Sequence, residues 1–253
     1  MSKTPMNLQL SVIVPVFNEE KTILEVLGAL EKALPAGHEI IVVDDGSADG
    51  TAAIVEKYAG KHKSVRLIRH PQNKGKTAAL VTGFAASTGA IVIVQDADLE
   101  YDPAEIADVI APILSNRADV VYGSRFLTRR ASRVLYYRHF LANRFLTGLS
   151  NLLTDLNFTD VETCYKAFRG EIIRNMVISS SGFGFEVEVT AKIAKLGCRT
   201  YEVPISYYGR TYQEGKKIGL KDGIHAIYYI FKYNLFTSLK GSYRQIPELR
   251  RKP

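Results

Sequence analysis

Short runs of apolar, mostly β-branched residues alternate with amphipathic stretches along the first half of the chain. Such runs are typical of buried strands, and the stretches between them repeat their apolar positions at helical spacing. Strands separated by helices in this way predict a doubly wound, mostly parallel sheet of the α/β class. The predicted strands are Leu10–Val14, Glu39–Val43, Val65–Arg69, Ala90–Gln95 and Asp119–Gly123, and the predicted helices span about 19–33, 50–60, 75–87 and 103–115.

The pattern changes after residue 123. The later elements that we expect are an arginine-rich helix over 132–153, a strand at Thr163–Phe168, a helix over 184–196, a strand over 199–206, a loop over 207–222 and a last helix over 223–239. Together these elements predict one domain over 9–240 with halves at 9–123 and 124–240, preceded by an extension (1–8) and followed by a basic tail (241–253).

Composition adds two constraints. The chain has 253 residues, 46% of them hydrophobic, which is enough to bury one substantial core. Its two cysteines lack metal-ligand spacing, and the N-terminus shows no signal peptide, so a reducing cytoplasmic location is expected. The most apolar long stretch, Gly223–Leu239, is interrupted by His225, Lys232 and Asn234 and therefore does not predict a membrane span.

Polar and acidic residues follow several of the predicted strands. In a doubly wound sheet the ligand binds outside the carboxyl ends of the strands, so these segments should converge on one edge. The segments are Pro15–Glu19, Asp44–Ser47, Asn73–Lys76 and Asp96–Asp98.

The pair Asp96 and Asp98 directly follows an apolar strand. If the backbone continues extended, alternation places both carboxylates on one side, with Glu100 as a further oxygen ligand. Mg²⁺ or Mn²⁺ binds a few carboxylates together with phosphate oxygens, which is the chemistry of a nucleoside diphosphate leaving group. Two acids at this spacing also occur in ordinary capped turns, so the spacing alone leaves both interpretations open.

The other acidic strand ends have structural interpretations as well. A carboxylate of Asp44 or Asp45 can accept hydrogen bonds from a nucleobase or a ribose, but it can equally form an Asx turn before the next helix. In that turn Asp49 or Ser47 would be the N-cap. Glu19 and Glu20 suit a helix N-terminus in the same way.

Four motifs occur in a fixed order: SVIVPVFNEE at 11–20, VVDDGSADGT at 42–51, NKGK at 73–76 and QDAD at 95–98. In this order and at these strand ends they resemble family 2 glycosyltransferases, and in particular the dolichol- and polyprenol-phosphate sugar synthases. The resemblance covers about residues 8–240. It implies a nucleotide-diphospho-sugar transferase fold of the GT-A type, with a nucleotide-binding first half and an acceptor-binding second half carrying amphipathic helices.

The resemblance also implies an inverting, metal-dependent hexosyltransferase that uses a nucleotide sugar of the GDP-mannose or UDP-glucose type. The sequence leaves open which of these, or an N-acetylhexosamine nucleotide, is the donor. The candidate nucleotide-binding residues are Pro15, Asn18, Glu19, Asp44, Asp45, Lys76 and Asp96; the candidate ligands of Mg²⁺ or Mn²⁺ are Asp96, Asp98 and Glu100, the last at a position where relatives often have glutamine.

Later segments match the family as well. Gly123–Arg125 corresponds to the segment whose arginine meets the acceptor phosphate, and Arg138 to a second phosphate-binding arginine, whereas a nearby family serine is Ala142 here. Residues 160–168 (DVETCYKAF) resemble the signature Asp-x-x-x-Gly-Phe-Lys-x-Phe, with Cys164 in place of glycine. Arg210 lies in a segment matching a loop that closes over the donor diphosphate, where Lys216 and Lys217 would assist it.

The window 120–154 contains six arginines and no acidic residue. A phosphate monoester is already ionised and needs positioning, which arginine forks such as Arg125, Arg133 and Arg138 provide. The window therefore favours a phosphate acceptor, which the resemblance implies is a polyprenyl or dolichyl phosphate. A hydroxyl acceptor would need a general base, for which Asp160 is the candidate. The catalytic candidates are thus Asp98, Arg125, Arg210 and Asp160.

Two apolar stripes suggest contact with a membrane. One lies within 140–153; the other comprises Ile224, Ile227, Tyr228, Phe231 and Leu235. Either stripe can simply pack against the sheet, or it can lie on an anionic membrane surface with basic residues at the headgroups. We therefore expect a peripheral protein on the cytoplasmic face of a membrane.

Two other classes of protein fit less well. A nucleotidyltransferase would need a glycine-rich loop after the first strand, which Pro15–Glu19 is not. A non-enzymatic nucleic-acid- or lipid-binding module would use the basic patches but leave three acidic strand ends unexplained, so no nucleic-acid partner is expected. The sequence does not indicate an oligomeric state.

Overall fold

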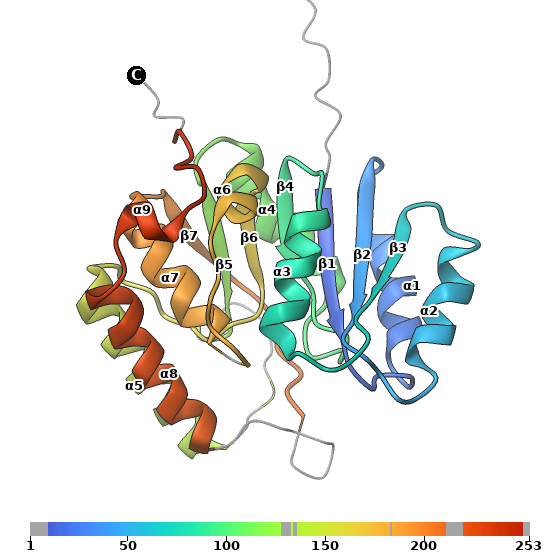
Figure 1. Ribbon diagram of the computed structural model, residues 1–253, viewed down its shortest axis with the longest axis horizontal. Coiled ribbons are helices and arrows are strands. Elements are labelled where there is room, and N and C mark those ends of the chain that lie inside the picture. Colours follow the sequence, from blue (N-terminus) through green and yellow to red (C-terminus); the bar gives the residue numbers. More distant parts are fainter. Residues whose placement is uncertain (1–9, 128–132, 134–135, 183, 211–219, 250–253) are drawn as a thin grey trace, which may run out of the picture.

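The computed structural model describes residues 10–127, 133, 136–182, 184–210 and 220–249 (Figure 1). The strands are β1 (Leu10–Val16), β2 (His38–Asp44), β3 (Val65–Arg69), β4 (Ile91–Val94), β5 (Val120–Ser124), β6 (Lys166–Arg169) and β7 (Thr200–Pro204). The helices are α1 (Ile23–Ala33), α2 (Thr51–Ala59), α3 (Lys76–Ala86), α4 (Ile106–Leu114), α5 (Tyr137–Thr154), α6 (Gly170–Asn175), α7 (Phe185–Leu196), α8 (Leu220–Leu235) and α9 (Leu239–Ser242), with a 3₁₀ turn η1 at Pro103–Glu105.

The strands form one seven-stranded sheet in the order β3-β2-β1-β4-β6-β5-β7. All neighbouring strands are parallel except β6, which pairs antiparallel with β4 and β5. Every residue of the central strand β1 is buried, as expected for a parallel strand covered on both faces. The predicted α/β class with a mostly parallel sheet is confirmed.

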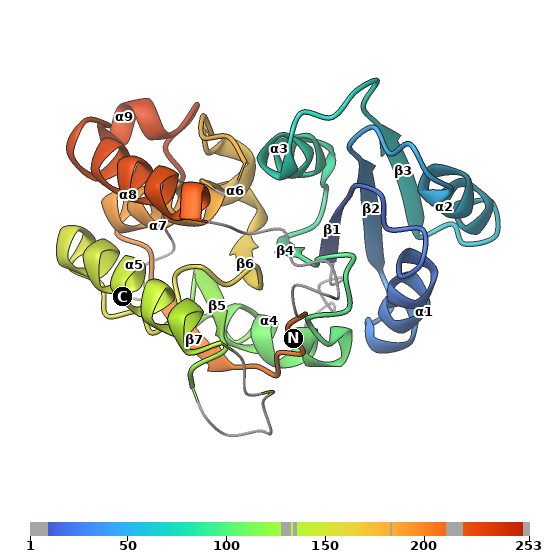
Figure 2. The same cartoon turned by 90° about the horizontal axis from the view of Figure 1, so that it is seen from below.

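Helices cover both faces of the sheet. Figure 2 shows α1 and α4 on one side and α3, α6 and α7 on the other, with α5, α8 and α9 outside the second layer. Alternation along β1 divides the core accordingly, because Val12 and Val14 pack with α1 and α4 while Ile13 packs with α3. Both outer helices α5 and α8 contact α7 and each other.

Several element boundaries differ from the sequence prediction. The arginine-rich helix begins at Tyr137, and the last long helix covers Leu220–Leu235, after which Ser238 caps a separate short helix, α9. The helices α6 and α9 were not predicted. The N-cap at Asp102 is confirmed, since its side chain accepts a hydrogen bond from Ala104 N at 2.9 Å.

Candidate active site

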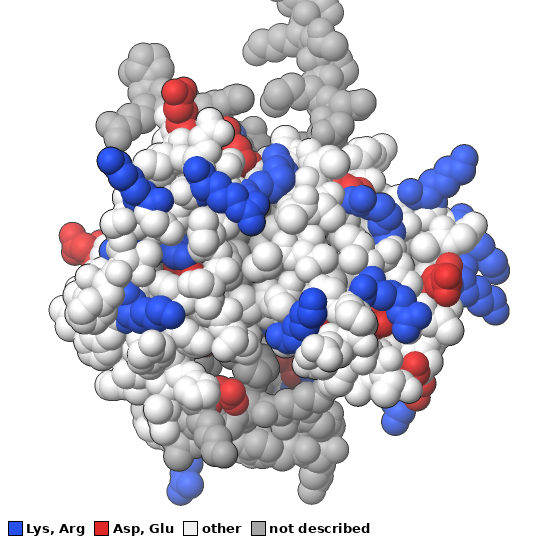
Figure 3. Space-filling model, in the orientation of Figure 1, with Lys and Arg blue, Asp and Glu red and all other residues white. Residues whose placement is uncertain are grey.

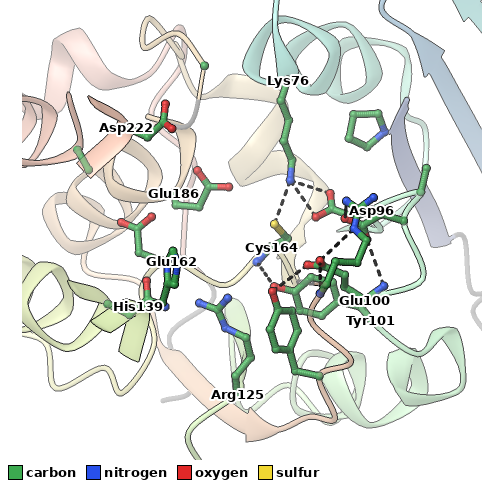
Figure 4. A pocket seen from close by; sticks show the side chains of 18 of the residues that line it. Lys76, Asp96, Glu100, Tyr101, Arg125, His139, Glu162, Cys164, Glu186 and Asp222 are labelled. Atoms are coloured by element: carbon green, nitrogen blue, oxygen red, sulfur yellow. Dashed lines mark hydrogen bonds and ion pairs between the residues drawn. The ribbon is translucent and has the colours of Figure 1, made fainter. Parts of the chain in front are cut away.

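The carboxyl ends of the strands open into a cavity of about 1200 Å³. The strand ends that the sequence predicted to converge meet there, with Pro15 at the end of β1, Asp45 after β2 and Asp96 after β4. Arg125 after β5 and the first turns of α5 and α8 complete the lining (Figure 4). The cavity is larger than most small-ligand pockets, so it can hold a nucleotide sugar and the head of a second substrate together.

The segment from Asp96 to Glu100 is a turn and not a continuation of the strand, so the predicted extended alternation is wrong. β4 ends at Val94, and Leu99 has a left-handed backbone with φ of 62°. The hydroxyl of Thr22 donates to Ala97 O at 2.7 Å and ties this turn to the start of α1. Asp96, Asp98 and Glu100 nevertheless all line the cavity.

Two cations pair with the carboxylates of the acidic turn. Lys76 Nζ lies 2.7 Å from Asp96 Oδ1 and 2.9 Å from Cys164 Sγ. Arg210 Nη2 donates to Asp98 Oδ2 at 2.7 Å, and Arg210 Nε donates to Glu100 Oε1 at 3.2 Å. Arg210 is distant in sequence from these acids, but the fold brings it to the end of β4, where they lie.

These cations do not fully compensate the negative charge. Burial, together with the charges of Asp96 and Glu100, raises the pKa of Asp98 to about 7 although Arg210 acts in the opposite direction. A site that holds a proton for this reason will also favour a divalent cation.

The donor set of the turn fits a hard metal ion, because Asp96, Asp98 and Glu100 supply only carboxylate oxygens. They are not arranged as a finished binding site: within the described ranges, no three or more acidic, histidine or cysteine side chains are grouped to hold a metal. Since Lys76 and Arg210 occupy the carboxylates, metal binding requires an exchange of these contacts.

The residues predicted to bind the nucleotide divide into two groups. Pro15, Glu19 and Asp45 line the cavity, and the Asp45 carboxylate accepts hydrogen bonds from Gly75 N at 2.7 Å and His70 Nδ1 at 2.6 Å. Asn18 and Asp44 do not line it.

Both of these outlying residues hold the strand-end loops in place. Asn18 Oδ1 accepts from Ala48 N, and fully buried Asp44 accepts from Ser47 N and lies 3.3 Å from Arg69 Nε. The structural interpretation of an Asx turn thus applies to Asp44, while Asp45 faces the cavity.

Arg125 forms another wall of the cavity and is held in place by Asp160. Its Nε and Nη2 each lie 2.7 Å from one carboxylate oxygen of Asp160, and the aromatic ring of Tyr207 lies 5.1 Å from its guanidinium carbon. Asp160 is fully buried behind Arg125 and does not line the cavity. Its position supports a role in fixing Arg125 more than direct contact with an acceptor hydroxyl.

The remaining predicted residues lie at the mouth or beyond the described chain. Arg138 and Ala142 line the cavity from α5. Arg133 lies outside the lining, where its Nη1 donates to Gly209 O at 3.0 Å and so contacts the segment that leads to Arg210. Lys216 and Lys217 lie outside the described residues.

Among the lining residues that were not predicted as site residues are Glu162, Glu186 and Tyr207. Tyr207 donates to Glu100 Oε2 at 2.8 Å. Glu186 lies in a helix that alternates apolar and acidic residues (Phe185–Val189), so its sequence pattern does not distinguish a cavity residue from a surface one. Glu162 lies within the recognised signature at a position the signature leaves unspecified.

The described helices include none that is both long and apolar enough to cross a bilayer. Instead, the stripe on α8 is exposed: Ile224 is 58%, Tyr228 59% and Leu235 59% accessible. The buried side of α8 is made by Ala226, Ile230 and Tyr233.

Comparisons with known proteins agree with this architecture. The sequence profile of the family "Glycosyl transferase family 2" matches residues 11–177. An undecaprenyl-phosphate mannosyltransferase of Micrococcus luteus is 30% identical over 225 residues, which cover 84% of this chain and 88% of that protein. A polyprenol monophosphomannose synthase of Mycolicibacterium smegmatis is 29% identical, with 82% of this chain and 80% of that protein covered.

Solved structures show the same fold. Glucosyl-3-phosphoglycerate synthase from Mycobacterium tuberculosis, in complex with Mn²⁺, uridine diphosphate and glucosyl-3-phosphoglycerate, superposes with a TM-score of 0.68 and 21% identity. The superposition covers 89% of this chain and 80% of that protein.

Proposed function

Because the chain belongs to glycosyl transferase family 2, we propose that it moves a hexose from a nucleotide sugar to a polyprenyl phosphate at a membrane surface. Named relatives that act on undecaprenyl or polyprenol phosphate support this acceptor. The observation that carries the proposal is one cavity with an acidic turn on one wall and cavity-lining arginines, Arg125 and Arg138, on another.

The acidic wall suits the donor. Asp96, Asp98 and Glu100 would hold Mg²⁺ or Mn²⁺, which would neutralise charge on the departing diphosphate; Mn²⁺ in the neighbouring fold supports this choice of cation. Arg210 would exchange its carboxylate contacts for the diphosphate oxygens, as an arginine fork favours phosphate. Asp45 and Pro15 would line the nucleoside side of the cavity.

The arginine wall suits the acceptor. Arg125 is held rigidly by Asp160 and Tyr207, so it can orient an anionic oxygen without reorganisation. In the proposed reaction an acceptor phosphate oxygen attacks the anomeric carbon. The bond from that carbon to the diphosphate breaks, and the configuration inverts. No base has to remove a proton, because the phosphate is already ionised.

The exposed helices support a location of this chemistry beside lipid. Figure 3 shows few charged side chains on the described surface over α8. Tyr137 and Arg138 at the start of α5 combine exposed aromatic area with a charge at the cavity mouth. An aromatic and basic rim of this kind favours the headgroup region of a membrane.

A test should separate acceptor from donor binding. We expect Arg138→Ala to raise KM for a polyprenyl phosphate by about 10–100-fold, as loss of one charge-assisted contact implies. The Kd of the donor, measured by calorimetry with Mn²⁺, should change less than about twofold, since Arg138 lies away from the acidic turn. Arg138 is preferred to Arg125, whose removal would leave buried Asp160 unpaired.

The matched control is Arg144→Ala. Arg144 is an exposed arginine on the same helix and does not line the cavity. Equal KM values in the two variants would contradict the acceptor role of Arg138. Absence of any transfer from GDP-mannose or UDP-glucose to a polyprenyl phosphate in the unmodified protein would contradict the proposed function itself.

A further inference from the structure

A second acidic wall faces the acidic turn across the cavity. Figure 4 shows Glu162 and Glu186 on the side away from Asp96 and Glu100, with Arg125 below them. Glu162 comes from the segment between α5 and β6, and Glu186 from the first turn of α7. Neither is used by the donor and acceptor contacts described above.

Glu186 is buried in a fixed position, and one of its carboxylate oxygens lacks a hydrogen-bond partner in the described structure. Its side chain is only 3% exposed, and its Oε2 has no hydrogen-bond partner among the described residues, although the residue lines the cavity. The turn before it packs tightly on α8, because a Cβ on Gly184 would collide with the ring of Tyr229. A buried carboxylate oxygen without a partner is costly, so this arrangement indicates that a ligand supplies the missing donor.

Glu162, beside Glu186, is also a carboxyl group with an unsatisfied oxygen. Its Oε1 is also buried without a hydrogen-bond partner in the described part of the chain. Lys166 holds its segment by donating to Val161 O and Thr163 O. Burial and the charge of Glu186 raise the pKa of Glu162 to about 8, so near neutral pH this carboxyl group mostly keeps its proton.

Together the two groups offer one hydroxyl donor and several acceptor oxygens. An ionised phosphate has no hydrogen to donate to the unsatisfied carboxyl oxygens, and a nonpolar group would leave both oxygens unsatisfied. Sugar hydroxyls both donate and accept, so they satisfy both groups. The pair also lies across the same cavity from the acidic turn, where the diphosphate is proposed to bind.

We propose that Glu162 and Glu186 form the subsite that binds free hydroxyl groups of the transferred hexose. This inference rests on the proposed function, which requires a sugar in this cavity. It assigns donor-sugar selection to the second half of the chain and nucleotide binding to the first.

The test compares each sugar nucleotide with its own diphosphate. In calorimetry with Mn²⁺, Glu186→Gln should weaken binding of GDP-mannose or UDP-glucose by about 5–20-fold, because a charged acceptor is replaced by a neutral one. Binding of GDP or UDP should stay within about twofold. Glu162→Gln should have a smaller effect of about threefold or less, since an amide still donates and accepts as the protonated acid does.

Monodeoxy analogues of the bound sugar nucleotide sharpen the test. At least one of these analogues should bind the unmodified protein more weakly than the complete sugar nucleotide does. In Glu186→Gln the loss of affinity for that analogue, relative to the complete sugar nucleotide, should be much smaller. Glu56→Gln, an exposed acid on α2, is the control and should behave as the unmodified protein does.

Two other results would have different meanings. Equal weakening of sugar nucleotide and diphosphate in Glu186→Gln, or an unchanged deoxy penalty, would overturn the subsite but leave the proposed function intact. If the unmodified protein bound neither GDP-mannose nor UDP-glucose nor their diphosphates with Mn²⁺, the proposed function would fail and the subsite with it.

Discussion

At the scale of single residues, the pKa of Asp98 reflects the negative charge of the whole acidic turn. Because burial and its acidic neighbours raise the pKa of Asp98 to about 7, the carboxyl group holds a proton below that pH, and a cation must displace it. Metal affinity should therefore fall as the pH drops through 7. We expect Mn²⁺ to bind about tenfold more weakly at pH 6 than at pH 8, measured by calorimetry in the presence of GDP or UDP.

Asp98→Asn is the control for this pH dependence. The variant should bind Mn²⁺ weakly at both pH values, because the amide cannot ionise. Equal Mn²⁺ affinity of the unmodified protein at pH 6 and pH 8 would show that Asp98 is not the group whose proton competes with the metal.

Site residues differ in how far the sequence predicts them. Asp45, Asp96 and Arg125 follow strands directly, so the rule for parallel sheets places them at one edge without knowledge of the tertiary structure. The turn at Leu99 could not be predicted, since a leucine does not mark a left-handed position and the hydrogen bond from Thr22 to Ala97 joins residues far apart in the sequence.

At the scale of elements, the position of α3 depends on a close approach to the sheet. Gly83 packs directly on β1, and a Cβ at this position would overlap the side chain of Ile13 and touch Val43. Gly83→Ala should therefore lower the free energy of unfolding by about 1–3 kcal/mol, as overpacking of a core does. Urea unfolding followed by circular dichroism measures the change.

Gly28→Ala in α1 is the matched substitution. A Cβ there would meet no atom within 4 Å, so the helix propensity of alanine should raise the stability by about 0.5–1 kcal/mol. The same sign of change in both variants would contradict a packing role for Gly83.

The last long helix shows that the spacing of apolar residues does not predict which face of a helix is buried. The spacing of Ile224, Tyr228 and Leu235 predicts an apolar stripe, and the stripe is present, but it faces outward. The face that docks on α7 carries Ala226, Ile230 and Tyr233 instead. α8 has apolar residues on two of its faces, and only the tertiary packing decides which face is buried.

At the scale of the whole molecule, we expect the outward stripe to give one face of the protein an affinity for lipid. Phe231 and Leu235 are 40% and 59% exposed on α8, and neither lines the cavity. Phe231→Ser combined with Leu235→Ser should reduce binding to vesicles of equal parts phosphatidylcholine and phosphatidylglycerol by about tenfold or more, since each buried apolar side chain contributes about 1 kcal/mol or more. Vesicle cosedimentation measures the bound fraction.

The control replaces two exposed leucines on the other side of the sheet with serine. Leu24 and Leu114 are 55% and 48% exposed on α1 and α4, and replacing both with serine should leave vesicle binding unchanged because these helices face away from α8. The α8 variant should still transfer sugar to a short-chain, water-soluble polyprenyl phosphate, since its cavity is intact, while losing transfer to a long-chain acceptor in vesicles. Equal loss with both acceptors would mean that the stripe supports the active site and not membrane binding.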